Sequence, residues 1–322
     1  FLEVPNTSRP ESIEFSLLRH CPDMDFTSTA LESLWQNAHT QQWPRHTLYV
    51  VATPIGNIAD ISIRALYALQ LVDAIACEDT RHSKPLLAQY GISKPLIAVH
   101  DHNEAEAATG LIERLRNGER IALITDAGTP AISDPGSRVV AAAHAAGIRV
   151  MPIAGASAAV AAMSAAGLDG GFQFIGFLPS KTMARAHALT ALARTPTHLV
   201  FYEAPHRLHE TITTMAELFP TRSLTVAKEL SKLHENVLTL ALKDAPDWLA
   251  SAPAARGEYV LILSAPTEEI STDTPVWHTT LLVLLEELPL KQAVALTVKL
   301  TQASKNDVYS HALALKNNTV SS

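Results

Sequence analysis

The chain contains 322 residues, 47% hydrophobic and 18% charged, a composition that excludes a disordered chain and suffices for the cores of two domains. Its net charge of −7 excludes bulk electrostatic attraction as the main mode of nucleic-acid binding, although a local basic patch remains compatible with it. Two cysteines exclude a disulfide framework, no apolar run has the length of a membrane span, and no signal-peptide pattern is present, so we expect a cytoplasmic protein without a membrane partner.

The first ordered domain is expected to begin near residue 46. Residues 1–45 show no sustained hydrophobic period, and we expect a leader that is poorly ordered or loosely docked, with a short amphipathic helix at 29–38. From residue 46 to 168, apolar runs typical of strands alternate with amphipathic stretches typical of helices. The expected strands are 47–52, 72–76, 96–99, 121–124 and 148–153. This alternation predicts an N-terminal α/β domain with a largely parallel sheet covered on both faces.

A second domain is expected over residues 169–265. Three glycines within residues 167–171 break the first pattern, and strand-like runs then follow with fewer helices between them. This order predicts a second α/β domain with a mixed sheet. Residues 265–275 read as a linker, and 276–322 as a small helical tail.

The tail permits two interpretations. Its short helices and four lysines resemble a small helix-turn-helix, which would dock the protein on a nucleic acid. The same pattern fits a capping or dimerising appendage, in which Leu281, Leu284, Leu285 and Leu288 pack onto a partner subunit.

Three loops rich in small residues follow strands of the first domain. They are Thr53–Asn57, Thr125–Gly136 and Pro152–Ser157. Because the carboxyl ends of parallel strands share one edge, we expect the loops to converge there on a ligand. The glycine patterns of Rossmann and P-loop sites are absent, so other loops would hold a nucleoside. Asp126 is placed to accept hydrogen bonds from a ribose hydroxyl or an ammonium, and Gly128 permits close backbone approach.

Charged segments end several other strands. His100-Asp-His-Asn-Glu104 resembles a metal site, but no third ligand is identifiable, so a substrate-binding or helix-capping role is favoured and no metal is predicted. Glu78–His82 is an ionic cluster for which a structural ion pair is an equal alternative. Tyr202 is either part of the core or stacks on a base or cation.

These segments together resemble the tetrapyrrole-methylase-like (class III) family of S-adenosylmethionine-dependent methyltransferases, and within it the members that methylate the ribose of a cytidine in the 16S rRNA decoding region. The order and joint presence of the motifs carry this resemblance, which covers residues 47–264 and extends to Leu288–Lys291. The matching segments are Leu48–Asn57, Glu78–His82, His100–Glu104, Thr125–Pro130, Ser133–Gly136, Gly176–Pro179, Phe201–Glu203, His206-Arg207 and Lys228–Leu230.

The resemblance implies a two-domain class III fold, a homodimer, and a cofactor cleft between the α/β domains. The cofactor would be S-adenosylmethionine and the substrate 16S rRNA within the 30S subunit. The cofactor contacts that it implies are Pro54, Asp126, Gly128, Pro130, Ser157, Ala158, Tyr202 and Ala204. We expect substrate contacts from Arg81, His100, Arg207 and Lys228.

Methylation of a hydroxyl needs alignment of the reacting atoms and a group that takes the proton. Glu78, His102 and Glu229 are the candidate bases, and the sequence does not choose among them. Two alternatives stay open: methylation of a tetrapyrrole or another small molecule, and a non-catalytic nucleotide-binding module in ribosome assembly.

Overall fold

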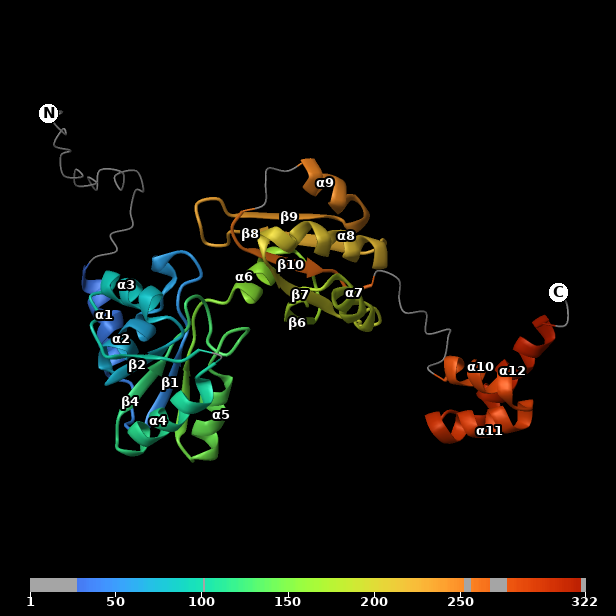
Figure 1. The fold of residues 1–322 in the computed structure, drawn as a ribbon, viewed down its shortest axis with the longest axis horizontal. Helices are drawn as coiled ribbons and strands as arrows, with labels where there is room; N and C mark the ends of the chain where they lie inside the picture. The colour runs from blue at the N-terminus through green and yellow to red at the C-terminus, as the bar shows by residue number, and fades with distance from the viewer. Residues whose placement is uncertain (1–27, 101, 252–255, 267–276, 320–322) are drawn as a thin grey trace. The chain divides into compact units, whose positions relative to one another are not determined.

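The computed structural model describes residues 28–100, 102–251, 256–266 and 277–319 (Figure 1). Contacts within the chain divide it into two compact units. The first contains the described residues up to Ala161 together with Glu229–Glu235, and the second contains Ala162–Lys228 and the described residues from Asn236 onward. Residues 1–27 of the expected leader, and Asp101 of the charged segment at 100–104, lie outside the described residues.

The first unit is built on a five-stranded parallel sheet with the strand order β3-β2-β4-β1-β5. The prediction of a parallel sheet is therefore confirmed. Its central strands are short and apolar, as expected for strands buried on both faces. The strands are β1 (Thr47–Val51), β2 (Ala74–Cys77), β3 (Leu96–Ala98), β4 (Arg120–Leu123) and β5 (Arg149–Ile153).

Helices cover both faces of this sheet because successive residues of a strand point to opposite sides. Tyr49 packs in a core with α2 (Ile63–Leu71) and α3 (Thr80–Gln89). The next residue toward the amino end, Leu48, packs in a second core with α4 (Glu104–Arg116) and α5 (Ser137–Ala145). A short 3-10 helix, η2 (Ile58–Asp60), precedes α2, and α6 (Ala158–Ala165) follows β5.

The part of the expected leader from Ser28 onward lies among the described residues. The expected helix is present as α1 (Ser28–His39). The ring of Trp35 meets Tyr67 of α2 edge-on at 5.3 Å, and Trp43 packs against the sheet core. Aromatic burial therefore holds this segment to the domain.

The second unit contains a mixed sheet with the order β6-β7-β10-β8-β9, as predicted. β6 and β7 are parallel, whereas β10 is antiparallel to both of its neighbours and β8 is antiparallel to β9. The strands are β6 (Phe172–Phe177), β7 (His198–Glu203), β8 (Ser223–Lys228), β9 (Asn236–Ala241) and β10 (Tyr259–Leu263).

One core packs this sheet against its helices, with Phe201 and Leu261 facing Ile212 and Met215. The longer helices are α7 (Thr182–Ala191) and α8 (Leu208–Leu218). The short helices are η3 (Pro205–Arg207), η4 (Leu242–Asp244) and α9 (Ala245–Ser251). The sequence did not predict α9, since its second position is Pro246 and its single apolar stripe is too short to show a period.

The tail forms three helices with their own core: α10 (His278–Glu287), α11 (Leu290–Thr301) and α12 (Lys305–Thr319). Leu281 is fully buried there, and Leu284, Leu285 and Leu288 pack around the same core. The leucines that one interpretation placed on a partner subunit therefore contribute to the core of the tail itself.

Candidate functional site

The three small-residue loops meet at the carboxyl edge of the first sheet. β1 lies between β4 and β5, so the loops after these strands are neighbours. The Thr53 amide donates to the Gly128 carbonyl at 2.9 Å, and the Gly128 amide donates back to Thr53 at 3.1 Å. The Thr129 hydroxyl donates to the Ala156 carbonyl at 3.0 Å, which ties in the third loop. The predicted convergence of the loops is confirmed.

Asp126 presents an unsatisfied acceptor at this edge. Its Oδ2 lies 2.9 Å from Nδ1 of His82. Its Oδ1 is buried and has no hydrogen-bond partner among the described residues. The side chain as a whole is 32% exposed. A buried acceptor without a partner costs free energy, so Oδ1 is an atom that a bound donor, such as a ribose hydroxyl or an ammonium, would satisfy.

The loop that carries Asp126 is held in an unusual backbone conformation. Gly128 has a φ of 89°, which only glycine adopts readily, and Ala131 and Ser133 both have a φ of 66°. Left-handed conformations cost free energy in non-glycine residues and concentrate at functional sites. Pro130, between them, is buried. This geometry favours a ligand-binding loop over an ordinary connection.

The ionic cluster at 78–82 caps α3 and touches the Asp126 loop. Asp79 is the N-cap of α3, and Arg81 donates to it at 2.6 Å, which holds the pKa of the Asp79 carboxyl well below its ordinary value. The hydrogen bond to Asp126, and then its charge, raises the pKa of His82. Glu78 is half-buried and accepts from the hydroxyl of the buried Thr125 at 3.0 Å. The cluster is thus both structural and part of the site edge.

The charged segment at 100–104 divides into exposed and buried parts. His100 and His102 are exposed, with ring centroids 6.2 Å apart. Glu104 is buried, and its Oε1 accepts from the Gly136 amide at 2.9 Å and the Arg138 amide at 2.8 Å. It therefore caps the N-terminus of α5, as a carboxylate does best. No three His, Cys, Asp or Glu side chains are grouped for a metal ion in the part of the chain that the structure describes.

The segment Glu229–Glu235 follows β8 and belongs to the first unit. Lys232 Nζ donates to Glu229 Oε1 at 2.9 Å. A Cβ added to Gly56 would lie 2.5 Å from Lys232 Cγ, so the lysine stem lies directly over the first loop. Glu229 and Ser231 have φ values of 51° and 65°. Lys232 was not among the predicted site residues, and only its place in a charged strand end hinted at it.

The remaining predicted residues of the first unit lie at the same edge. Pro54 is buried in the first loop, Ser157 is half-buried before α6, and Ala158 is the first residue of that helix. Arg81 is exposed, with a side-chain accessibility of 86%. The Thr53 hydroxyl donates a hydrogen bond to the Thr125 carbonyl at 3.0 Å, which holds the two loops together. Neither threonine was among the predicted site residues.

Four predicted residues belong to the second unit. Tyr202 is half-buried and its ring meets Phe174 at 4.9 Å, and Ala204 is the N-cap of η3. Lys228 Nζ lies 5.8 Å from the centre of the Tyr259 ring. Arg207 is engaged internally: it donates to the Leu178 carbonyl at 2.6 Å.

Arg207 also forms an ion pair at 3.2 Å with Glu203, which is buried at the end of β7. Its side chain is 18% exposed. Because the Arg207 guanidinium is largely enclosed and donates to the Leu178 carbonyl, it holds the loop that follows β6 in place.

Comparisons with known proteins agree with this geometry. The family model described as Tetrapyrrole (Corrin/Porphyrin) Methylases matches residues 47–246. The model described as RsmI C-terminal HTH domain matches residues 273–316, in agreement with the helix-turn-helix interpretation of the tail.

Several relatives carry the name Ribosomal RNA small subunit methyltransferase I. The protein of Pseudomonas aeruginosa is 48% identical over 83% of this chain and 96% of its own length. The protein of Haemophilus influenzae is 45% identical over 83% of this chain and 96% of its own length. That of Escherichia coli O157:H7 is 44% identical over 83% and 94%.

Solved structures share the fold at lower identity. Diphthine synthase is 17% identical, with a TM-score of 0.53 over 68% of this chain and 90% of its own. The methyltransferase CobJ is 21% identical, with a TM-score of 0.51 over 68% and 93%. In the described part of the chain, no helix has the length and apolar character needed to cross a membrane.

Proposed function

Because this chain belongs to the tetrapyrrole methylase family, in the group of ribosomal RNA small subunit methyltransferase I, we propose that it methylates the 2′-hydroxyl of a cytidine in the decoding region of 16S rRNA, with S-adenosylmethionine as methyl donor. The identity of 48% over nearly the whole length of a relative with that name is the observation that carries the proposal. The match of the tail to the RsmI C-terminal domain supports the same group over the family's other members.

The first-unit loops fit the cofactor. Oδ1 of Asp126 is the buried acceptor that a ribose hydroxyl or ammonium of the cofactor would satisfy, and Gly128 leaves room for close approach. S-adenosylmethionine supplies a methyl group on a sulfonium. Pro54, Pro130, Ser157 and Ala158 would form the walls around it, and the family resemblance assigns further cofactor contacts to Tyr202 and Ala204.

The protein's part in the chemistry is to align the hydroxyl and take its proton. Of the three candidate bases, we favour Glu229. Its strained backbone and its ion pair with Lys232 fix the carboxylate beside the first loop. Glu78 accepts a hydrogen bond from the Thr125 hydroxyl, so its carboxylate would position the Asp126 loop. Among the described residues, the exposed His102 has no comparable ion pair, and it suits contact with the substrate.

We propose that Arg81, His100, Lys228 and Arg207 contact the rRNA within the 30S subunit. Arg81 and His100 are exposed, Lys228 is half-buried, and Arg207 also holds the loop at 178–179. The protein would act as a homodimer in the cytoplasm, where small subunits mature. A Glu229→Gln variant should keep cofactor affinity and lose methyl transfer, and an unchanged turnover would remove Glu229 from the role of base.

The tail is proposed to dock the enzyme on the particle. Lys291, Lys299 and Lys305 are exposed, and phosphate contacts supply affinity without sequence reading. Deletion of residues 276–322 should spare cofactor binding in calorimetry and raise KM for 30S subunits. A truncated protein that methylates 30S subunits at the full rate would exclude the docking role.

Transfer of labelled methyl from S-adenosylmethionine tests the enzyme and its substrate together. Small subunits would be purified from a strain that lacks this gene and, as a control, from the complemented strain. Label should enter the 16S rRNA of subunits from the strain that lacks the gene, and not that of subunits from the complemented strain. No label in either would overturn the proposal, and label on uroporphyrinogen instead would favour a small-molecule methylase.

A further inference from the structure

A hollow on the first unit extends from Arg81 away from the loops described above and contains two lysines, Lys84 and Lys94, that no proposed role uses. It has a volume of about 780 Å³ and lies between α3 and the segment that leads into β3. That volume falls in the range of about 300–1,000 Å³ that is typical of ligand sites. The residues that line it are Thr80, Arg81, Lys84, Leu87, Ala88, Gly91, Ile92, Ser93, Lys94 and Leu96.

The floor of the hollow is apolar and its other side chains include three cations. Leu87 and Ile92 are buried, and Leu96 is half-buried. None of the lining residues is acidic. Arg81 is partly neutralised by Asp79, but neither Lys84 nor Lys94 has an ion-pair partner among the described residues. The hollow therefore attracts an anion and offers apolar surface beside it.

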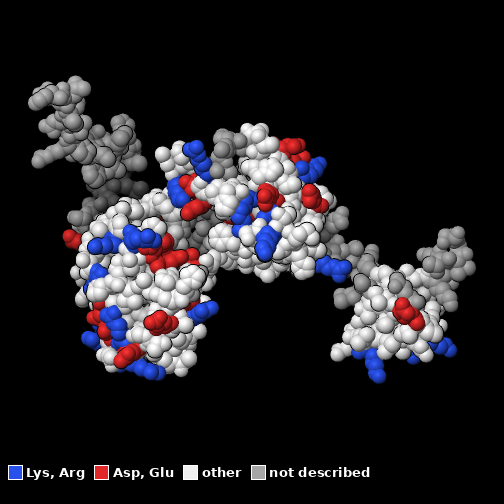
Figure 2. All heavy atoms as spheres, viewed as in Figure 1, with Lys and Arg blue, Asp and Glu red and all other residues white. Residues whose placement is uncertain are grey.

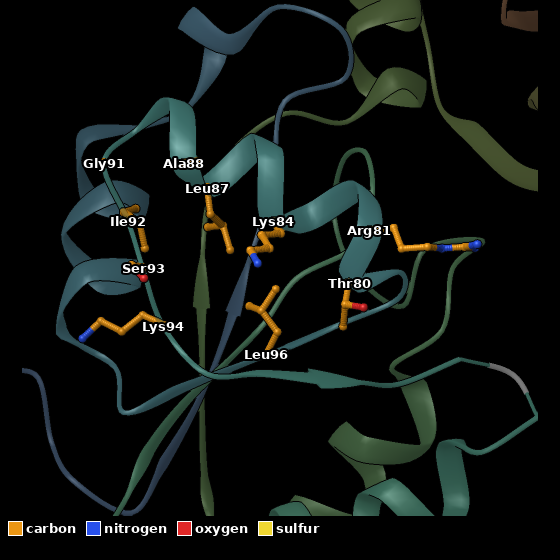
Figure 3. A pocket seen from close by; sticks show the side chains of 10 residues that line it. All are labelled: Thr80, Arg81, Lys84, Leu87, Ala88, Gly91, Ile92, Ser93, Lys94 and Leu96. Carbon is orange, nitrogen blue, oxygen red and sulfur yellow. The ribbon is translucent and has the colours of Figure 1, made fainter.

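The cations follow one another along the hollow instead of meeting at one point. Arg81, Lys84 and Ala88 lie on one face of α3 at intervals of three and four residues. Figure 3 shows Lys84 and Leu87 reaching from α3 toward Leu96, with Arg81 and Lys94 at opposite ends. A site for a single small anion would have cationic side chains that converge on one point. A row of separate cations suits a ligand that carries several charges along its length.

The row begins at the proposed active site. Arg81 precedes His82, whose ring contacts Asp126. Lys84 is one helical turn farther along, a rise of about 4.5 Å from Arg81 at 1.5 Å per residue. Figure 2 shows Lys and Arg side chains on the surface of the first unit next to a group of acidic ones, so the positive charge is local within an acidic chain.

We propose that this hollow, which we call the α3–β3 groove, binds the phosphate backbone of the single-stranded rRNA segment that carries the target nucleotide, with Lys84 and Lys94 as phosphate contacts. The proposal rests on the proposed function and names where its substrate runs. Sequence-specific recognition of RNA mostly targets unpaired segments, whose backbone a row of cations can follow. The apolar floor would take the ribose and base faces that the unpaired strand exposes.

The test compares Lys84→Ala/Lys94→Ala with Arg116→Ala/Arg149→Ala, which removes the same charge from exposed positions at the end of α4 and the start of β5 that do not line the groove. Initial rates of methyl transfer to 30S subunits that lack the modification are measured against substrate and salt concentration. Calorimetry with S-adenosylhomocysteine and thermal melting check the cofactor site and the fold.

The groove variant should raise KM for 30S subunits by about two- to thirtyfold, the effect of two exposed ion pairs, with turnover and cofactor affinity unchanged. Each lost phosphate contact lowers the salt slope by about 0.7, so the two together lower it by about 1.4. The control variant should behave as wild type.

Equal KM and salt slope for the groove variant and wild type would overturn this inference and leave the proposed function standing. Wild-type protein that transfers no methyl group to rRNA would overturn both. If Lys84→Glu/Lys94→Glu loses binding of inorganic phosphate but keeps the wild-type KM for 30S subunits, the groove takes a free anion and the inference is wrong.

Discussion

Replacing Asp126 with asparagine tests the cofactor site most sharply. The substitution keeps the shape of the side chain and removes its charge. In the protein, Oδ2 contacts His82 at 2.9 Å, while Oδ1 is buried without a partner. The two oxygens therefore have separate roles, and His82→Ala serves as the matched control because it removes the Oδ2 contact and a longer pair with Asp79 while it leaves Oδ1 unchanged.

The expected effect on the cofactor is large and the effect on stability is small. A hydrogen bond to a charged group contributes about 1.5–3 kcal/mol, so Asp126→Asn should weaken cofactor binding about 10- to 150-fold. The variant loses no protein hydrogen bond at Oδ1, and its contact with His82 is exposed to solvent, which screens it. Its melting temperature should fall by less than about 4 °C.

Calorimetry with S-adenosylhomocysteine measures the affinity, and scanning calorimetry measures the melting temperature of the same samples. His82→Ala should bind the cofactor within about threefold of wild type, the effect of an exposed contact. A folded Asp126→Asn variant with wild-type affinity would remove Asp126 from the site. Equal losses in the two variants would mean that His82, through Oδ2, holds the only functional contact.

Three other contacts can be tested by substitution. Gly56→Ala places a methyl group 2.5 Å from Lys232 Cγ at a φ of 150°, so it should cost about 1–3 kcal/mol of unfolding free energy and lower methyl transfer. Adding Lys232→Ala to this variant should restore part of the lost stability. If it restores none, the clash with Lys232 is not the cause. Glu104→Ala leaves two amides at the start of α5 without their acceptor and should cost about 1–3 kcal/mol in urea unfolding, whereas the exposed Glu106→Ala, on the same helix, should cost little; equal values would exclude the cap. The raised pKa of His82 means that its ion pair stabilises the fold fully below the pKa of an unfolded histidine and is lost as pH rises through the higher folded value; NMR titration should show that pKa falling in Asp126→Asn, and an unchanged pKa would contradict the assignment.

Patterns along the chain were enough to predict the sheets and the meeting of the loops. Short apolar runs ending in small residues identify parallel strands, and parallel strands place their C-terminal loops at one edge of the sheet. That geometry brought Thr53 and Gly128 together without any knowledge of their hydrogen bonds. The meeting of the loops depends only on the direction of the strands, and the alternation of strands with helices predicts that direction.

Contacts between distant loops could not be predicted in this way. Glu104 caps α5 because the helix that it begins runs beside α5, and nothing in His100–Glu104 distinguishes such a cap from a ligand contact. Lys232 lies over Gly56 because the segment after β8 joins the first unit. Both depend on tertiary packing, which local pattern does not encode.

Side chains with two plausible uses were the other difficulty. The guanidinium of Arg207, for which we expect a substrate contact, also pairs with Glu203 and donates to the Leu178 carbonyl, and its position in the sequence did not predict these internal contacts. Leu281 was assigned in one interpretation to a partner subunit, but it fills the core of the tail. An apolar or charged residue at a helix start is compatible with either use until its neighbours are known.

The position of the methyl group on the rRNA is the most direct test of the central claim. Purified protein, labelled S-adenosylmethionine and 30S subunits from a strain lacking the gene would be incubated, and the 16S rRNA digested with alkali. A 2′-O-methyl group removes the hydroxyl that attacks the neighbouring phosphate, so the label should be recovered in an alkali-resistant dinucleotide that begins with cytidine. Label released in mononucleotides would place the methyl group on a base and contradict the account.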